Sequence, residues 1–146
     1  MLALLCLSAV LLIDFAYFPR QGPVQLINSG QKTISLAGQV VKVSVADTPQ
    51  AREKGLSGRI KLASDEGMLF IFSSDAKYSF WMKDMRFPID ILWISSDEKI
   101  LDMRQNVSPE TYPAVFTPSS PARYVLELSA GYSEAHGVKI GDTIRL

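Results

Sequence analysis

The sequence predicts one domain of the α+β class that is mainly β: a compact, barrel-like or strongly curved, antiparallel-rich sheet with two short helices. Three observations predict this fold class. Short apolar blocks recur along the chain, turn-forming residues separate these blocks, and few segments carry helix-start signals. A length of 146 residues with 47% hydrophobic content suits a single folded domain.

Residues 1–18 have the character of a membrane-directed segment that precedes this domain. Sixteen of them are apolar, and only Ser8 and Asp14 interrupt the run. A helix of this length would reach about 27 Å, close to the roughly 30 Å of hydrocarbon in a bilayer. We prefer an uncleaved signal anchor, because the basic start and small residues of a cleavable signal peptide are not evident; a cleaved signal and a mis-assigned start codon remain alternatives. Residues 19–32 are expected to form a linker and residues 33–146 the globular domain.

The first half of the domain predicts a hairpin, a helix and a buried strand. Residues 33–46 alternate polar and apolar side chains around an Ala-Gly turn, as the two strands of a hairpin do. Thr48 is a suitable helix N-cap and Pro49 a suitable first residue, so a helix should run to about Ser57. The continuous apolar run 67–72 predicts a strand covered on both faces.

The second half predicts further strands around one irregular, proline-rich excursion. Four prolines between residues 106 and 122 oppose both helix and central strand there. The remaining expected elements are strands at 78–83, 89–94, 99–104 and 123–128, a helical turn or two at 130–136, and a hairpin-like pair at 138–146.

Charge and residue usage exclude several classes of function. Fifteen basic and fifteen acidic residues cancel, so no nucleic-acid partner is expected. The single cysteine, Cys6, lies in the apolar N-terminal segment, which leaves the globular part without disulfides or thiolate sites. The single histidine, His136, cannot build a zinc site or a triad alone, and no phosphate-binding glycine loop is present. No metal and no cofactor are therefore expected.

The run 80–94 forms a polar elbow between two apolar strands. Lys83 and Asp90 end and open these strands, and we expect them to form a salt bridge. The alternative is a polar pocket floor, flanked by Trp81 and Trp93, that receives a small polar or sugar-like ligand. The candidate ligand-binding residues are Trp81, Lys83, Asp84, Asp90, Trp93 and Glu127.

Glu127 is a carboxylate inside the apolar strand 123–128. It either faces solvent or is buried and paired with Arg59 or Lys83, because a buried unpaired charge is costly. General acid or base duty is the third possibility. Asp90 and Glu127 would be the minimum pair for a hydrolase if they met across an open cleft.

Several motifs in one order resemble the domain of unknown function 192 (DUF192) family. The motifs are Ala46-Asp47-Thr48-Pro49, Gly55-Leu56-Ser57-Gly58-Arg59, Gly67-Met68-Leu69-Phe70, Phe80-Trp81-Met82-Lys83 leading to Pro88-Ile89-Asp90, Tyr124-Val125-Leu126-Glu127-Leu128, Ala130-Gly131 and Gly141-Asp142. Asp84-Met85 departs from the small polar pair of the pattern. The resemblance implies a compact β-rich fold, often exported or membrane-tethered, with no established activity, cofactor or catalytic residue.

These observations favour a membrane-tethered extracytoplasmic binding or interaction module. The elbow and the proline-rich excursion would be its recognition surface. Its expected partners are the membrane, through the N-terminal segment, and a small polar ligand or a protein. The domain would be secreted if the N-terminal segment were cleaved. The alternative is a hydrolase of cell-envelope polymers that uses Asp90 and Glu127.

Overall fold

The computed structural model describes residues 31–146. This part of the chain holds eight strands, two α-helices and one 3-10 turn: β1 (Lys32–Leu36), β2 (Gln39–Ala46), α1 (Pro49–Lys54), β3 (Glu66–Ala76), β4 (Phe80–Trp81), β5 (Ile89–Ile94), β6 (Ile100–Val107), η1 (Pro109–Thr111), β7 (Val115–Phe116), β8 (Ala122–Ser129) and α2 (Tyr132–Ala135). The expected mainly β domain with two short helices is confirmed. The proposed N-terminal anchor, residues 1–18, lies outside the described residues, as does nearly all of the linker. Among residues 31–146, no helix is long and apolar enough to cross a bilayer.

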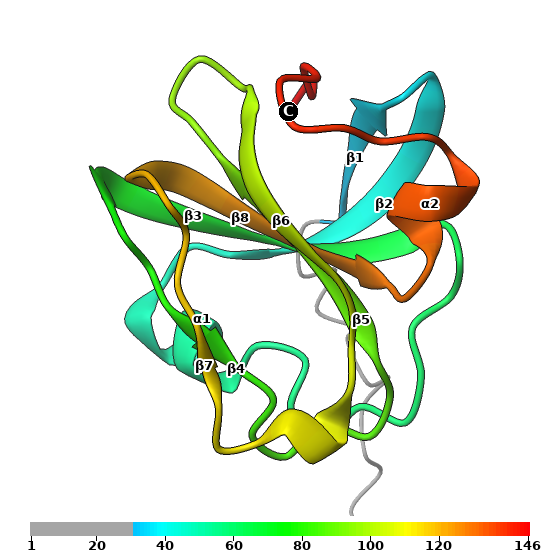
Figure 1. Cartoon of the computed structure of the whole chain (residues 1–146), viewed down its shortest axis with the longest axis vertical. Helices are drawn as coiled ribbons and strands as arrows, with labels where there is room; N and C mark the ends of the chain where they lie inside the picture. Colours follow the sequence, from blue (N-terminus) through cyan, green and yellow to red (C-terminus); the bar gives the residue numbers. More distant parts are fainter. Residues whose placement is uncertain (1–30) are drawn as a thin grey trace, which may run out of the picture.

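Six strands form one sheet in the order β1-β2-β3-β8-β5-β6 (Figure 1). Only β2 and β3 pair in parallel, because the crossover that contains α1 connects them. The short strands β4 and β7 pair separately. The sheet is strongly curved and is not closed into a barrel of strands. Near the C-terminus, Arg145 forms an isolated bridge with Ser35, and Thr143 forms one with Lys99.

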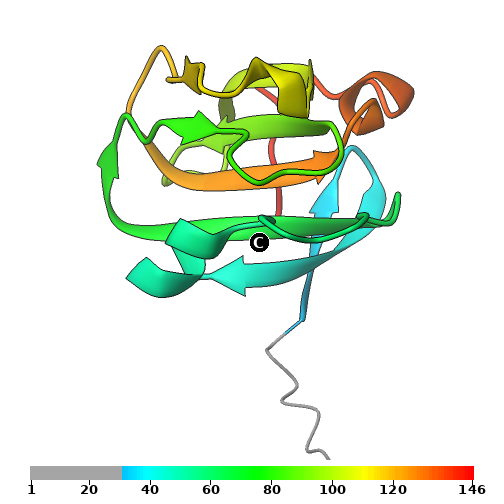
Figure 2. The same ribbon diagram turned by 90° about the horizontal axis from the view of Figure 1, so that it is seen from below.

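Side chains of the central strands point alternately to two hydrophobic clusters, one on each face of the sheet. On β8, Leu126 and Leu128 enter a cluster with Tyr132 of α2, and we call this side the α2 face. Val125 enters the other cluster, which contains Leu56 after α1, and we call this side the α1 face. Figure 1 shows α1, β4 and β7 below the sheet and the C-terminal segment above it, and Figure 2 shows α1 along β2 and β3.

Four expected boundaries need correction. Helix α1 begins as expected, with the Thr48 side chain accepting from the Ala51 amide at 3.1 Å, but it ends at Lys54 because Gly55 adopts φ 50°. The strand expected over 78–83 is only the two-residue β4, since residues 82–86 turn into the next strand. Strand β6 extends to Val107, so the irregular excursion begins later, and this excursion contains β7. Residues 138–146 form isolated bridges instead of a hairpin, because their partners are Ser35 and Lys99.

The proline-rich excursion is fastened to the sheet by Asp102. This nearly buried carboxylate accepts the Ser119 amide at 2.8 Å and the Arg104 guanidinium at 2.5 Å. Desolvation by burial acts to raise the pKa of Asp102, but these hydrogen bonds outweigh it and hold the pKa below its ordinary value. The anchored excursion brings β7 alongside β4, where Trp81 pairs with Val115.

Candidate functional site

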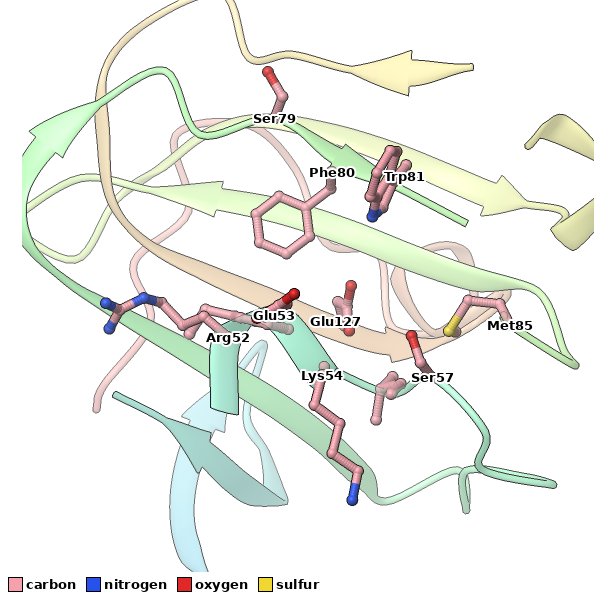
Figure 3. Close-up of a pocket in the computed structure, with 12 residues that line it drawn as sticks. Arg52, Glu53, Lys54, Ser57, Ser79, Phe80, Trp81, Met85 and Glu127 are labelled. Atoms are coloured by element: carbon pink, nitrogen blue, oxygen red, sulfur yellow. The ribbon is translucent and has the colours of Figure 1, made fainter. Parts of the chain in front are cut away.

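A pocket of about 350 Å³ opens on the α1 face, between α1 and β4. Its walls come from four parts of the chain: α1 and the loop after it, Phe70 of β3, the segment 79–85 around β4, and Glu127 of β8. Figure 3 shows Glu127 between the side chains of Phe80 and Trp81 on one side and Lys54 on the other.

The α1 wall is fixed to the sheet by Arg52. Its Nη1 donates to the carbonyl oxygens of Asp47 at 2.6 Å and Ile71 at 2.9 Å. The guanidinium also lies over the Phe72 ring, 5.2 Å from the ring centroid. Figure 3 shows it pointing away from Glu127. Arg52 is therefore engaged in holding α1 on β3.

The loop after α1 is joined to the segment after β4. Ser57 Oγ donates to the Lys83 carbonyl oxygen at 3.0 Å, and the Gly58 amide donates to the Asp84 carbonyl oxygen at 3.0 Å. Asp84 contributes its main chain, in the left-handed region at φ 57°, while its side chain stays exposed. These two bonds set the distance between the two walls of the pocket.

The floor of the pocket is Glu127, whose exposed fraction is 5%. Its Oε2 is buried and has no hydrogen-bond partner among the described residues. Desolvation raises the pKa of Glu127 to about 8, with the positive charge of Arg59 opposing the rise. At neutral pH the carboxyl is therefore mostly protonated, and it can donate one hydrogen bond and accept others.

Gly67 allows β3 to approach the backbone beneath this carboxyl. A Cβ at this position would lie 2.8 Å from the Glu127 carbonyl oxygen, which is closer than real Cβ contacts. Close packing against the backbone of Glu127 therefore requires a glycine at the first position of the Gly67-Met68-Leu69-Phe70 motif.

Arg59 lies in an adjoining pocket of about 490 Å³ that shares Lys54, Gly55 and Ser57 with the first. Its Nη2 donates to Ser44 Oγ at 3.2 Å. Among the described residues, no ion pair joins Glu127 to Arg59 or to Lys83. The expected pairing of a buried Glu127 is therefore wrong: the carboxyl is buried, and its raised pKa makes it neutral rather than paired.

The expected salt bridge between Lys83 and Asp90 is also absent from the described part of the chain. Asp90 is fully buried, and its Oδ1 accepts the amides of Asn106 at 2.9 Å and Gly131 at 3.2 Å, while Oδ2 accepts that of Ser133 at 2.8 Å. These amides fix β6 and the start of α2 around the carboxylate. Lys83 instead lies over Trp81, with Nζ 5.7 Å from a ring centroid.

Asp90 and Glu127 lie on opposite faces of the sheet. Glu127 pairs with Ile91 of β5, and Asp90 pairs with Leu128 of β8. Cross-strand partners share a face, and neighbours along a strand do not. The two carboxyl groups therefore do not meet across a cleft, and the pair expected for a hydrolase is not formed.

The two tryptophans are divided between core and surface. Trp93 is buried in the α1-face core, and its Nε1 donates to the Tyr78 carbonyl oxygen at 2.8 Å. Trp81 is 52% exposed and lines the pocket. Of the six candidate residues, Trp81 and Glu127 line the pocket. Lys83 contacts Trp81 outside the pocket, and Asp84 lies at the pocket edge. Asp90 and Trp93 do not line the pocket.

Sequence reasoning missed the contribution of α1 and the loop that follows it. Lys54, Gly55, Leu56 and Ser57 line the pocket, together with Phe70, Phe80 and Met85. The Gly-Leu-Ser-Gly sequence was the available signal, because two glycines so close together mark a constrained loop. No group of three or more histidine, cysteine, aspartate and glutamate side chains within residues 31–146 is placed to hold a metal ion.

Comparisons with known proteins agree with this fold. The model of the DUF192 family, described as an uncharacterized ACR, matches residues 31–146. A crystal structure of a candidate transcription regulator from Sinorhizobium meliloti is 35% identical, with a TM-score of 0.72 over 77% of this chain and 89% of that chain. A protein of unknown function from Novosphingobium aromaticivorans is 27% identical, with a TM-score of 0.75 over 90% of this chain and 94% of that chain. No curated protein matches the chain.

Proposed function

This chain belongs to the uncharacterised DUF192 family, and we propose that it is a membrane-tethered, extracytoplasmic module that binds a small polar ligand in the Glu127 pocket. The observation that carries the binding proposal is the Glu127 carboxyl group at the base of an open pocket, whose buried Oε2 has no hydrogen-bond partner within residues 31–146. A buried polar atom without a hydrogen bond is costly, and a bound ligand can supply the missing partner.

The contacts around Glu127 support this interpretation. Arg52 and Ser57, which could have reached into the pocket, are both bonded to backbone carbonyl oxygens. The walls are therefore held in place while the floor keeps its hydrogen-bonding capacity. Pre-formed walls with a few unsatisfied polar groups are typical of small-molecule sites.

Binding can be tested with a screen of small polar compounds against the full-length chain in detergent, using ligand-observed NMR. Glu127→Leu removes both polar atoms of the carboxyl, and replacing a buried unpaired acid by an apolar side chain should not unfold the domain. Glu134→Leu, at an exposed position on α2, is the matched control. We expect compounds that bind the wild type and the control but not Glu127→Leu. Compounds that bind all three proteins equally, or none that bind, would reject the proposed site.

The tether is tested by fractionation. The apolar run 1–18 should hold the full-length chain in the membrane fraction, while residues 31–146 alone should be recovered without membranes. Full-length protein in the soluble fraction with residues 1–18 retained would contradict the anchor. Arg20 lies on the domain side of the apolar segment, and positive charges next to such a segment influence its orientation in the membrane. Accessibility of the domain to an external protease measures the orientation of the anchor.

A nucleic-acid partner is not part of this proposal. The Sinorhizobium meliloti protein is described as a candidate transcription regulator. The present chain balances fifteen basic against fifteen acidic residues, and it therefore lacks the excess positive charge that nucleic-acid binding normally requires.

A further inference from the structure

The chemical class of the ligand can be inferred from the wall that faces α1. Phe80 is fixed in that wall, because its ring packs edge to face against Phe70 at 4.9 Å and against Trp93 at 6.3 Å between centroids. Trp81 continues the wall outward, with 52% of its surface exposed. The 47% exposed Tyr112 lies 6.0 Å from it, centroid to centroid. An aromatic surface therefore leads from the pocket to the outside of the domain.

The charges at the Glu127 floor of the pocket do not favour an ionic ligand there. The Arg52 guanidinium is bonded to two carbonyl oxygens, and Figure 3 shows it and the Lys54 ammonium pointing away from Glu127. Arg59, the positive group that acts on Glu127, lies in the adjoining pocket and donates to Ser44 Oγ. At the floor, a cation would need the ionised form of Glu127, which burial disfavours and which is the minor form at neutral pH. The other carboxyl group that lines the pocket, that of Glu53, belongs to the α1 wall.

A neutral carboxyl group matches a hydroxyl group on both sides of the hydrogen bond. Its O–H can donate to a hydroxyl oxygen, and its other oxygen can accept a hydroxyl proton. Aromatic side chains next to such a group offer an apolar surface to the C–H face of a ring. The pocket thus presents hydrogen-bonding capacity at its base and aromatic contact along one wall.

We infer that the pocket binds a neutral, hydroxyl-rich ring, that is, a sugar unit, with a hydroxyl on Glu127 and one ring face against Trp81, and that a linked sugar chain continues toward Tyr112. This inference rests on the proposed binding function and specifies its ligand. Because a second unit would contact the exposed aromatic pair, a linked oligomer should bind more tightly than its monomer.

Glu127→Gln separates hydrogen bonding from charge. The amide keeps a donor and an acceptor in nearly the same shape but cannot ionise. For a sugar, we expect Glu127→Gln to retain binding to within a few-fold and Glu127→Leu to abolish it. An organic cation bound by Glu127 would be lost in both variants, since neither can supply a negative charge at the floor.

The pH dependence gives a second readout. Because the pKa of Glu127 is about 8, wild-type affinity for a sugar should be constant below about pH 7. It should then fall over the titration range around the pKa, because the carboxylate can accept but no longer donate a hydrogen bond, and level off at higher pH. Glu127→Gln should show no such fall. Binding of an amine would instead strengthen as the pH rises toward 8.

The experiment uses the full-length chain in detergent, titrated with N-acetylglucosamine, glucose and their β-1,4-linked trimers, and with choline and inorganic phosphate as ionic probes. Binding is followed by ligand-observed NMR, and contact with Trp81 by fluorescence. The chain has two tryptophans, and Trp93 is buried, so the fluorescence change should disappear in Trp81→Phe. Sugar binding with the expected Glu127→Gln and pH behaviour supports the inference.

Absence of sugar binding at tens of millimolar, or sugar binding that Glu127→Leu leaves intact, overturns the inference. If choline or phosphate binds in a Glu127-dependent manner and the sugars do not, the ligand class is wrong while the binding function stands. If neither these probes nor the compound screen distinguishes the wild type from Glu127→Leu, the binding function itself fails.

Discussion

Two buried carboxyl groups on neighbouring strands, Asp90 on β5 and Glu127 on β8, have opposite surroundings. On the α2 face, Asp90 accepts three backbone amides and has no access to solvent. On the α1 face, Glu127 has a buried oxygen that finds no partner in the described part of the chain, and it lies at the base of a pocket. Asp90 therefore stabilises the fold, whereas Glu127 is the better candidate for a ligand contact, because unsatisfied buried groups with a raised pKa concentrate at functional sites.

The comparison also explains why burial alone is a poor guide to function. Both groups are nearly inaccessible, and each has apolar neighbours on both sides along its strand. They differ in what lies opposite them: three amide donors in one case and open volume in the other. The following predictions test whether the two groups really differ in this way.

The largest expected effect is that of Asp90→Ala. Three amide groups would lose their acceptor, and each buried donor left without a partner costs about 1–3 kcal/mol. We expect unfolding of residues 31–146 in urea to lose about 4 kcal/mol. Asp90→Asn retains one acceptor oxygen and should lose less. A loss below about 1 kcal/mol for Asp90→Ala would show that these hydrogen bonds do not hold α2 and β6. The contrast between a structural Asp90 and an unsatisfied Glu127 would then be wrong.

The second effect concerns the pH dependence of stability at Glu127. Its pKa is about 8 in the folded chain, against an ordinary value of 4.5, so the folded form keeps a proton that the unfolded chain releases. The stabilisation from that proton is fully present below pH 4.5 and is lost as the pH rises through 8. Wild type should therefore lose up to about 1.4 kcal/mol per pH unit relative to Glu127→Gln in this window.

The free energy of unfolding of wild type and of Glu127→Gln can be measured in urea at several pH values between 4.5 and 8. The two proteins should be similar in stability near the acidic end, and Glu127→Gln should be the more stable near pH 8, by on the order of 4 kcal/mol. Parallel stability curves would mean that Glu127 ionises normally and is not desolvated. Asp90→Asn is a useful second reference, because it leaves Glu127 unchanged.

The smallest effect is expected for Lys83→Ala. Lys83 is exposed and contacts the ring of the half-exposed Trp81, a cation–π contact worth at most about 1 kcal/mol. Its removal should hardly change the urea midpoint. A loss as large as that of Asp90→Ala would instead point to a buried ionic partner for Lys83 and would restore the salt bridge that the sequence suggested.

Local patterns in the sequence determined much of the fold. Alternation placed the hairpin of β1 and β2, the apolar run Ile89–Ile94 coincides with β5, and Thr48 and Pro49 mark the start of α1. Phe70 is buried in the strand predicted for it. These features depend on steric preferences and hydrophobic periodicity over a few residues, which the chain carries with it wherever it folds.

Only the tertiary structure decided the roles of the charged residues. The amides that bind Asp90 come from positions 16, 41 and 43 residues away, and the pocket around Glu127 is assembled from α1, β3, β4 and β8. A shift of one residue in the pairing of β5 with β8 would place these two groups on the same face of the sheet. Register and topology are properties of the whole sheet, so no local pattern could show which carboxyl group would be satisfied and which would remain open to a ligand.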